Sequence, residues 1–185
     1  MNALDACIKT ILNDIRVELL DEFDKNFERG SFFGSAKWPK SARPGAQTPL
    51  IDSGNLRRSI RGTVSGNAVA FSSSLPYASI HNTGGTLTVT TKMKRYFWVK
   101  YIEATGKTTK TKSGQTANTK RNRTLSAAAQ FYKAMALKKT GSKIKIPQRQ
   151  FLGHHRSLEQ PVKDIIGRNL EELIRQTLPQ GKTQL

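Results

Sequence analysis

The sequence contains very little that would hold the chain in a membrane or cross-link it through disulfides. Its 185 residues include one cysteine, Cys7. No apolar run approaches the roughly 18 residues that suggest a membrane span. A lone cysteine excludes an internal disulfide framework and fits a reducing cytoplasm. The opening segment, MNALDACIKTILND, contains acids and no small-residue cleavage site. We therefore expect no membrane contact and no signal peptide.

Acidic residues are scarce in the middle of the chain. Residues 31–150 contain 22 Lys and Arg but only two acids, Asp52 and Glu103, which gives a net charge of +20. Residues 1–30 have four cations and seven acids (net −3), and residues 151–185 have five and four (net +1). The total of +18 therefore comes from the middle alone. Such a field favours contact with polyanions or with an acidic protein surface.

Groups of catalytic or metal-binding residues are also missing from the sequence. The only histidines are His81, His154 and His155, and no HExxH motif occurs. A zinc site usually needs three or four well-spaced ligands. Neither GxSxG nor a phosphate-binding glycine motif is present. The middle segment has too few acids for paired-carboxylate catalysis, and Asp52 is expected to cap the following turn. The sequence predicts no enzyme, no metal and no cofactor.

Both ends of the chain have the periodicity of amphipathic helices. Apolar residues recur at three- and four-residue spacing over residues 4–27, and Gly30 is placed to end that helix. A second stripe covers residues 158–174, where Ser157 and Gln160 have the spacing of a capping box. The first helix is long for a small domain, so we expect another subunit to cover part of its stripe.

Between these helices the pattern changes to short strands and turns. The sequence predicts a hairpin for RRSIRGTV and AVAFSSS, a short helical turn for PYASIHNTGG and a strand for TLTVTT. Met93, Phe97 and Tyr101 lie four apart and predict a helix with an aromatic core face. LSAAAQFYKAMALKK predicts a further helix, and residues 143–152 an extended arm.

These elements predict a single α+β domain over residues 1–185. Its long N- and C-terminal helices would pack on a small antiparallel β-sheet, with two more helices in the middle. Residues 105–123 contain six Lys or Arg, no acid and one aliphatic side chain, so we expect a mobile basic loop there. The basic and aromatic side chains of residues 92–123 leave a second hypothesis open, in which the chain is a non-specific nucleic-acid-binding protein.

The order of several segments resembles the phage virion morphogenesis (tail-completion) family of tailed bacteriophages. The resemblance covers nearly the whole chain, from the amphipathic start through the Trp38-Pro39 loop to the amphipathic end. The matching segments between them are TPLIDSGNLRRSI, PYASIHNTGG, KMKRYFWVKY and KIKIPQRQFLG.

The resemblance implies a structural protein that acts in tail completion or head–tail joining of a phage or prophage. It implies a location in the virion, with the host cytoplasm as the place of assembly, and tail or connector proteins as partners. A homo-oligomeric ring, with a hexamer favoured, would need a heterologous interface. We expect a negative end helix to meet a positive middle, and DNA contact to be possible but not specific. The expected interface or fold-defining residues are Arg57, Arg58, Tyr77, His81, Asn82, Arg149 and Phe151.

Within the arm, residues 143–152, the resemblance suggests a division of roles. Pro147 would stop the strand from pairing further, and Phe151 and Leu152 would pack the arm onto the body. Gln148 and Arg149 would then point to solvent or to a neighbouring subunit. An ordinary surface turn is the alternative.

Overall fold

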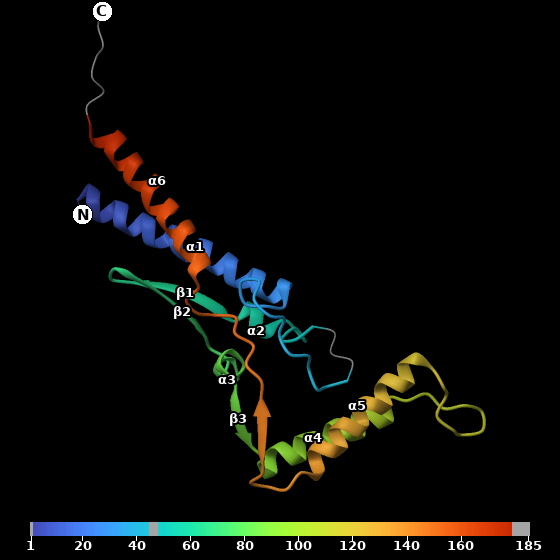
Figure 1. The fold of residues 1–185 in the computed structure, drawn as a ribbon. Helices are drawn as coiled ribbons and strands as arrows, with labels where there is room; N and C mark the ends of the chain where they lie inside the picture. Colours follow the sequence, from blue (N-terminus) through green and yellow to red (C-terminus); the bar gives the residue numbers. More distant parts are fainter. Residues whose placement is uncertain (1, 45–47, 179–185) are drawn as a thin grey trace, which may run out of the picture. The chain divides into compact units, whose positions relative to one another are not determined.

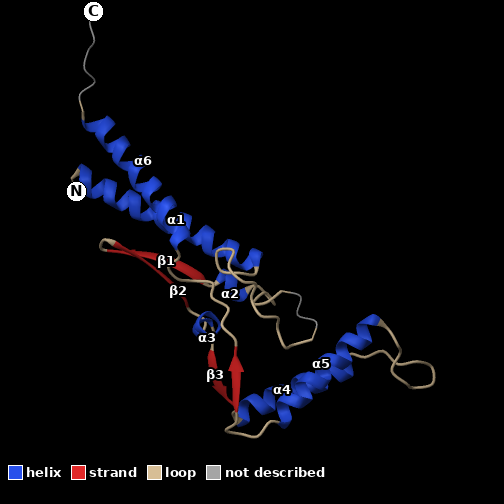
Figure 2. Ribbon diagram, in the orientation of Figure 1, coloured by secondary structure: helices blue, strands red, loops and turns tan. Residues whose placement is uncertain are grey.

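The computed structural model describes residues 2–44 and 48–178, and the chain divides into two compact units. Unit 1 comprises residues 1–37, 54–78 and 150–185, and unit 2 comprises residues 38–53 and 79–149. The α+β class is confirmed, as are long helices at both ends (Figures 1 and 2). The expectation of a single domain stays a prediction, because two compact units can still unfold together.

Unit 1 is built on the two terminal helices, α1 (Ala3–Arg29) and α6 (Glu159–Thr177), which lie side by side (Figure 1). The side chain of Asn2 caps α1, and Gly30 ends it with a left-handed backbone, φ 63°. Asn169 of α6 connects the two helices. Its side-chain amide donates to Asp14 at 3.0 Å, and its backbone carbonyl accepts from the Cys7 thiol at 3.6 Å.

The predicted capping box of the last helix is wrong. A 3₁₀ turn, η1 (Arg156–Leu158), precedes α6, so Ser157 lies inside the turn and does not cap the helix. His155 caps that turn instead, since its Nδ1 accepts from the Ser157 N–H at 3.2 Å. The His155 ring also stacks on Phe33, with 4.8 Å between ring centroids.

A short helix and a hairpin complete unit 1. Helix α2 (Asn55–Arg58) leads into the antiparallel strands β1 (Ile60–Ser65) and β2 (Ala68–Ser73), which confirms the predicted hairpin. Arg57 and Arg58, which the prediction placed in its first strand, lie in the helix instead. The hairpin packs on α1, where the rings of Phe23 and Phe71 meet edge to face at 5.1 Å. Aromatic burial between α1 and the hairpin is thus part of the core of this unit.

Unit 2 holds a second two-stranded sheet and a helical hairpin. The short helix α3 (Ala78–Thr83) begins in unit 1 and leads into β3 (Gly85–Thr88), which pairs antiparallel with β4 (Lys143–Ile146). The expected small antiparallel sheet is therefore two separate two-stranded sheets (Figure 2). Helices α4 (Thr91–Gly106) and α5 (Lys120–Leu137) pack against each other through Phe97, Phe131 and Tyr132.

The segment between α4 and α5 is shorter than the predicted loop of residues 105–123. Residues 105–106 belong to α4, and α5 begins at Lys120 because the Thr119 side chain caps it. Asn122 is buried and bonds across the loop base, donating to the Ala117 and Thr109 carbonyls at 2.7 and 3.0 Å. Its own oxygen accepts from the Thr109 N–H at 3.1 Å. These hydrogen bonds hold the base of the loop together, which the few apolar side chains of the loop could not do. The predicted mobility of the loop stays a prediction.

Candidate functional site

Arg57 anchors α2 to α1. Its guanidinium bonds to the carboxylates of Asp24 and Glu28, the latter at 2.7 Å. The hydrogen bond to Asp24 raises the pKa of Arg57 most, and the hydrogen bond to Glu28 raises it further. The adjacent Arg58 donates to the Asn55 side chain at 3.0 Å. Both arginines thus have contacts within unit 1, and an interface role for them stays a prediction.

Arg149 is buried, and the expectation that it points to solvent or to a neighbour is wrong. Its side chain is 7% exposed, and its guanidinium donates to the Pro39 and Lys40 carbonyls at 2.8 and 3.1 Å. Burial lowers its pKa. Its backbone N–H donates to the His81 carbonyl at 2.8 Å. Arg149 therefore fastens the loop after Trp38 and the helix α3 to the arm.

The histidine of α3 lies in the same cluster. His81 is half-buried, and this desolvation, with a smaller effect of the Arg149 charge, lowers its pKa. Gly84 follows with φ 71°, and a Cβ built on it would lie 2.9 Å from the Gln148 nitrogen. The close approach of the arm explains why glycine ends the segment YASIHNTG. Of the expected residues, the structure brings His81 and Arg149 together, with Asn82 following His81 in the same helix.

Phe151 and Tyr77 have opposite surroundings in unit 1. Phe151 is 1% exposed and its ring lies 5.2 Å from that of Phe27, as expected for an arm packed on the body. Its carbonyl accepts from the buried Asn26 amide at 3.3 Å. Tyr77 is 42% exposed and lies at the surface. Phe151 defines the fold, whereas Tyr77 is a surface residue whose interface role stays a prediction.

The remaining predictions about reactive residues concern acids and histidines. Asp52 forms a bidentate ion pair with Arg43, at 2.6 and 3.0 Å, so it does not cap the following turn. The pair lowers the pKa of Asp52. Among residues 2–44 and 48–178, no group of three or more His, Cys, Asp or Glu could hold a metal ion. None of the helices in that same part of the chain has the length and apolar character needed to cross a bilayer.

The two units divide the charge very unequally. Unit 2 contains 18 Lys and Arg but two acids, a net of +16, whereas unit 1 contains 13 and 11, a net of +2. Both acids of unit 2 are already in ion pairs, Asp52 with Arg43 and Glu103 with Lys100. Nearly all of the positive field that the sequence predicts therefore comes from unit 2.

Four of the seven acids of α1 lie in ion pairs within unit 1. Asp21 and Glu22 pair with Lys25, and Arg57 takes two more carboxylates of the helix. Asp14 accepts the Asn169 hydrogen bond described above. Two cations, Lys25 and Arg57, thus face four carboxylates and offset their charge only in part, so the expected negative face of this helix stays a prediction.

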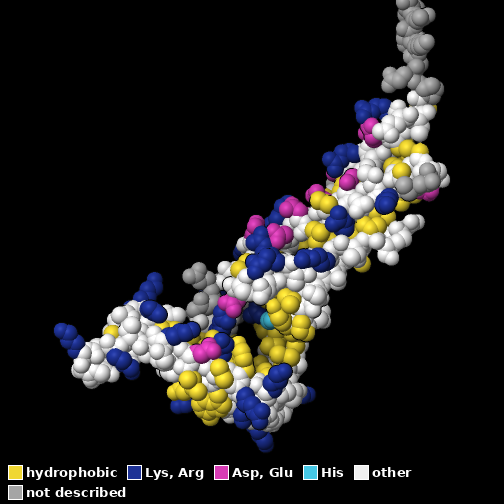
Figure 3. Space-filling model, turned by 180° about the vertical axis from the view of Figure 1, so that it is seen from behind, with side chains coloured by type: hydrophobic (Ala, Val, Ile, Leu, Met, Phe, Trp, Pro, Cys, Tyr) yellow, Lys and Arg dark blue, Asp and Glu magenta, His cyan; other side chains and the backbone are white. Residues whose placement is uncertain are grey.

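Two exposed apolar stripes are features that the sequence analysis missed. On α4, Tyr96, Val99 and Ile102 are 55%, 53% and 64% exposed, and Figure 3 shows hydrophobic side chains gathered over the α4–α5 hairpin. Apolar residues four apart are exposed in the same way, by 36% to 63%, along α6 and at the residue that follows it: Ile166, Leu170, Ile174 and Leu178. We name these the α4 stripe and the α6 stripe. The periodicity of both helices was visible in the sequence, but not which part of each apolar arc stays uncovered.

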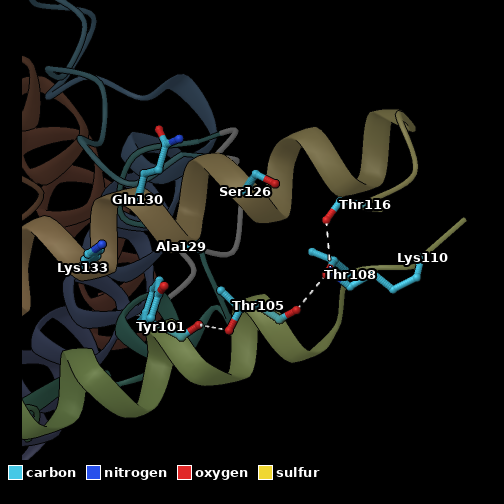
Figure 4. A pocket seen from close by; sticks show the side chains of 9 residues that line it. All are labelled: Tyr101, Thr105, Thr108, Lys110, Thr116, Ser126, Ala129, Gln130 and Lys133. Carbon is cyan, nitrogen blue, oxygen red and sulfur yellow. Dashed lines mark hydrogen bonds between the residues drawn. The ribbon is translucent and has the colours of Figure 1, made fainter. Parts of the chain in front are cut away.

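A groove lies between the open ends of α4 and α5 (Figure 4). Its volume is about 310 Å³, and its lining contains Lys110, Lys133 and several hydroxyl or amide side chains, with no carboxylate. A second hollow of about 390 Å³ shares Thr116, Ser126 and Gln130 with the first and adds Arg123. The two hollows therefore adjoin, and together they form the basic groove.

Comparison with known proteins identifies one family. Residues 8–171 match the phage virion morphogenesis family, a span that contains all of unit 2 and most of unit 1. No curated protein and no solved structure matches the chain.

Proposed function

Because this chain belongs to the phage virion morphogenesis family, we propose that it completes the tail or joins tail to head in a tailed phage or prophage. The family match over residues 8–171 is the observation that carries this proposal, since it supports a structural role in virion assembly. We propose a non-enzymatic subunit that works by docking to itself and to tail or connector proteins. Its place would be the virion, reached after assembly in the host cytoplasm.

The same proposal includes a homo-oligomeric ring, for which a hexamer is the favoured form. A ring needs a heterologous interface, in which one surface of a subunit meets a different surface of the next. The α4 stripe and the α6 stripe are two such surfaces, and we propose that the α6 stripe of one copy packs on the α4 stripe of its neighbour. Burying both would remove apolar side chains from water, worth roughly 25 cal/mol for each Å².

Charged residues beside the stripes support this pairing. Lys92 and Arg95 lie on α4 three or four residues from Tyr96 and Val99, and Glu171 lies on α6 three residues before Ile174. On α6, Lys163 lies three residues before Ile166, so opposite charge favours the proposed pairing at the C-terminal end of α6. The two cations of α4 oppose α4 packing on α4.

Placing a carboxylate in either stripe is expected to break the ring. We expect Ile102→Asp and Leu170→Asp each to shift the protein, seen by light scattering after size exclusion, to a monomer of 20.6 kDa. Burying an unpaired carboxylate in an interface costs several kcal/mol or more, on the order of the worth of an interface hot spot. Val17→Asp on α1 is the matched control, because Val17 is also apolar and 58% exposed but belongs to neither stripe.

Mixing the two variants tests the direction of the contact. Ile102→Asp keeps an intact α6 stripe and Leu170→Asp an intact α4 stripe, so the mixture should form a dimer and stop there. Dimers of Leu170→Asp alone would instead indicate that α4 packs on α4. A wild-type protein that stays monomeric at all concentrations would contradict the ring.

Deleting the gene from its phage tests the assembly role itself. We expect lysates that contain filled heads and separate, unfinished tails, visible by electron microscopy, and infectious titres restored by the gene supplied in trans. Normal joined particles from the deletion mutant would overturn the proposed role.

A further inference from the structure

We propose that the basic groove between α4 and α5 binds the phosphodiester backbone of a nucleic acid. This goes beyond the assembly role, because it assigns a ligand class to a surface that neither stripe uses. Its ligand is recognised by phosphate charge and hydrogen bonding, so no base sequence should be preferred.

The helical hairpin that forms the groove is almost purely cationic. Residues 91–137 contain eleven Lys and Arg and one acid, Glu103, whose carboxylate is paired with Lys100 at 2.8 Å. No counter-charge is left on the hairpin to neutralise the others. A polyanion with regularly spaced charges would relieve this repulsion and release its own counterions.

The groove supplies donors of the kinds that bind phosphate oxygens. Lys110, Lys133 and Arg123 provide charge from three positions on its walls. Lys110 donates to Thr116 at 3.3 Å, which leaves two of its ammonium hydrogens for a ligand. The side chains of Ser126 and Gln130 make no hydrogen bond within the part of the chain that the structure describes, and both residues line the two hollows. Their hydroxyl and amide groups are therefore available to donate.

The wall of the groove that the loop between α4 and α5 forms is fixed by hydrogen bonds within the protein. Asn122 is 1% exposed, and its hydrogen bonds to Thr109 and Ala117 fasten the two strands of the loop to the start of α5. Lys110 and Thr116 lie between these two anchored residues and also form a β-bridge. A preset wall reduces the entropy lost when a ligand binds.

Nucleic acid fits the groove better than an acidic protein does. Protein interfaces have apolar cores that are depleted in Lys, whereas interfaces with DNA are more polar and far more positive. The apolar residues of this groove are small, Ala117, Ala127 and Ala129, with Tyr101 the only aromatic ring in its lining. Four of the seven acids of α1 are already paired within their own unit, which leaves a second copy fewer carboxylates to place in the groove.

Affinity for labelled 20-mers, measured by fluorescence anisotropy between 50 and 200 mM NaCl, tests the groove. For the full chain carrying Lys110→Gln, Arg123→Gln and Lys133→Gln, the slope of log K against log salt should shrink by about 2–3, with roughly 100-fold weaker binding at 100 mM. The matched control replaces Lys139, Lys143 and Lys145 with glutamine. These three lysines are exposed in unit 2 and lie outside the groove. It removes the same charge and should lose less than about fivefold, since only screened attraction is lost.

Further measurements distinguish the possible ligands. Ser126→Ala with Gln130→Ala changes no charge, so we expect roughly 3–10-fold weaker binding with an unchanged salt slope. Duplex and single-stranded 20-mers of scrambled sequence distinguish which form of the backbone fits. Equal losses from both triple variants would show a diffuse field and overturn the site. Binding of polyglutamate as tight as that of DNA would also overturn it, in favour of an acidic protein.

The ring and the groove can fail separately. The groove variants leave the α4 and α6 stripes intact and should keep the oligomeric state of the wild type. Loss of DNA affinity in an intact ring supports the groove, and normal affinity in the monomeric Ile102→Asp variant shows that the groove acts without the ring.

Discussion

Replacing Phe151 with alanine is expected to destabilise unit 1 by about 3–5 kcal/mol, the usual cost of emptying a large aromatic site in a core. Phe151 is 1% exposed and packs on Phe27, which is fully buried. Its carbonyl also accepts from the Asn26 amide, whose own oxygen accepts from the Phe33 N–H at 2.8 Å. A cavity beneath the arm would therefore loosen the aromatic packing and also this hydrogen-bonded connection from α1 to the turn that follows it.

Urea denaturation measures the loss in free energy of unfolding, and hydrogen exchange of the α1 amides, measured separately, shows whether α1 is affected. Tyr77→Ala is the matched control, because it removes an aromatic ring that is 42% exposed and should cost less than about 1 kcal/mol. Equal stability of the Phe151 and Tyr77 variants would contradict the assignment of Phe151 to the core.

The terminal helices, both hairpin strands and α4 could be predicted from the sequence because their signals are local. The stripe over residues 4–27, the turn at Ser65-Gly66-Asn67 and the four-residue spacing of Met93, Phe97 and Tyr101 all lie within one element. The helix start at Glu159 was missed, since a 3₁₀ turn and a histidine cap compete with the capping-box pattern of the same residues.

The surroundings of Arg149 could not be predicted, because they depend on residues far away in the chain. A lone arginine between two glutamines looks like a surface residue, and its acceptors are carbonyls 109 and 110 positions earlier. Charge pairing was hidden in the same way: the sequence shows seven acids in residues 1–30, but not that Arg57 from α2 pairs with two of them. The uncovered stripes were missed because helix periodicity does not reveal which part of an apolar arc a neighbour covers.

Replacing Arg149 with methionine is expected to destabilise unit 2 by about 1–3 kcal/mol, because two part-buried hydrogen bonds from a charged donor to the Pro39 and Lys40 carbonyls are lost. Removing a buried charge returns some desolvation energy, which keeps the cost below the sum of two charged hydrogen bonds. Arg149 has no carboxylate partner within the described residues, so no opposite charge is stranded by the change. Arg149→Lys keeps the charge but not the fork that reaches both Pro39 and Lys40, and we expect an intermediate loss.

Hydrogen exchange resolved by residue locates the effect of each substitution. Arg149 and Phe151 are two residues apart but belong to different units. Arg149→Met should speed exchange in α3 and in the β3–β4 pair, while Phe151→Ala should speed it in α1. Lys145→Met, an exposed change in β4, should alter neither. If both core variants speed exchange equally throughout, the chain unfolds as the single cooperative domain that its sequence predicts. Separate responses would mean that the arm joins two independently stable bodies.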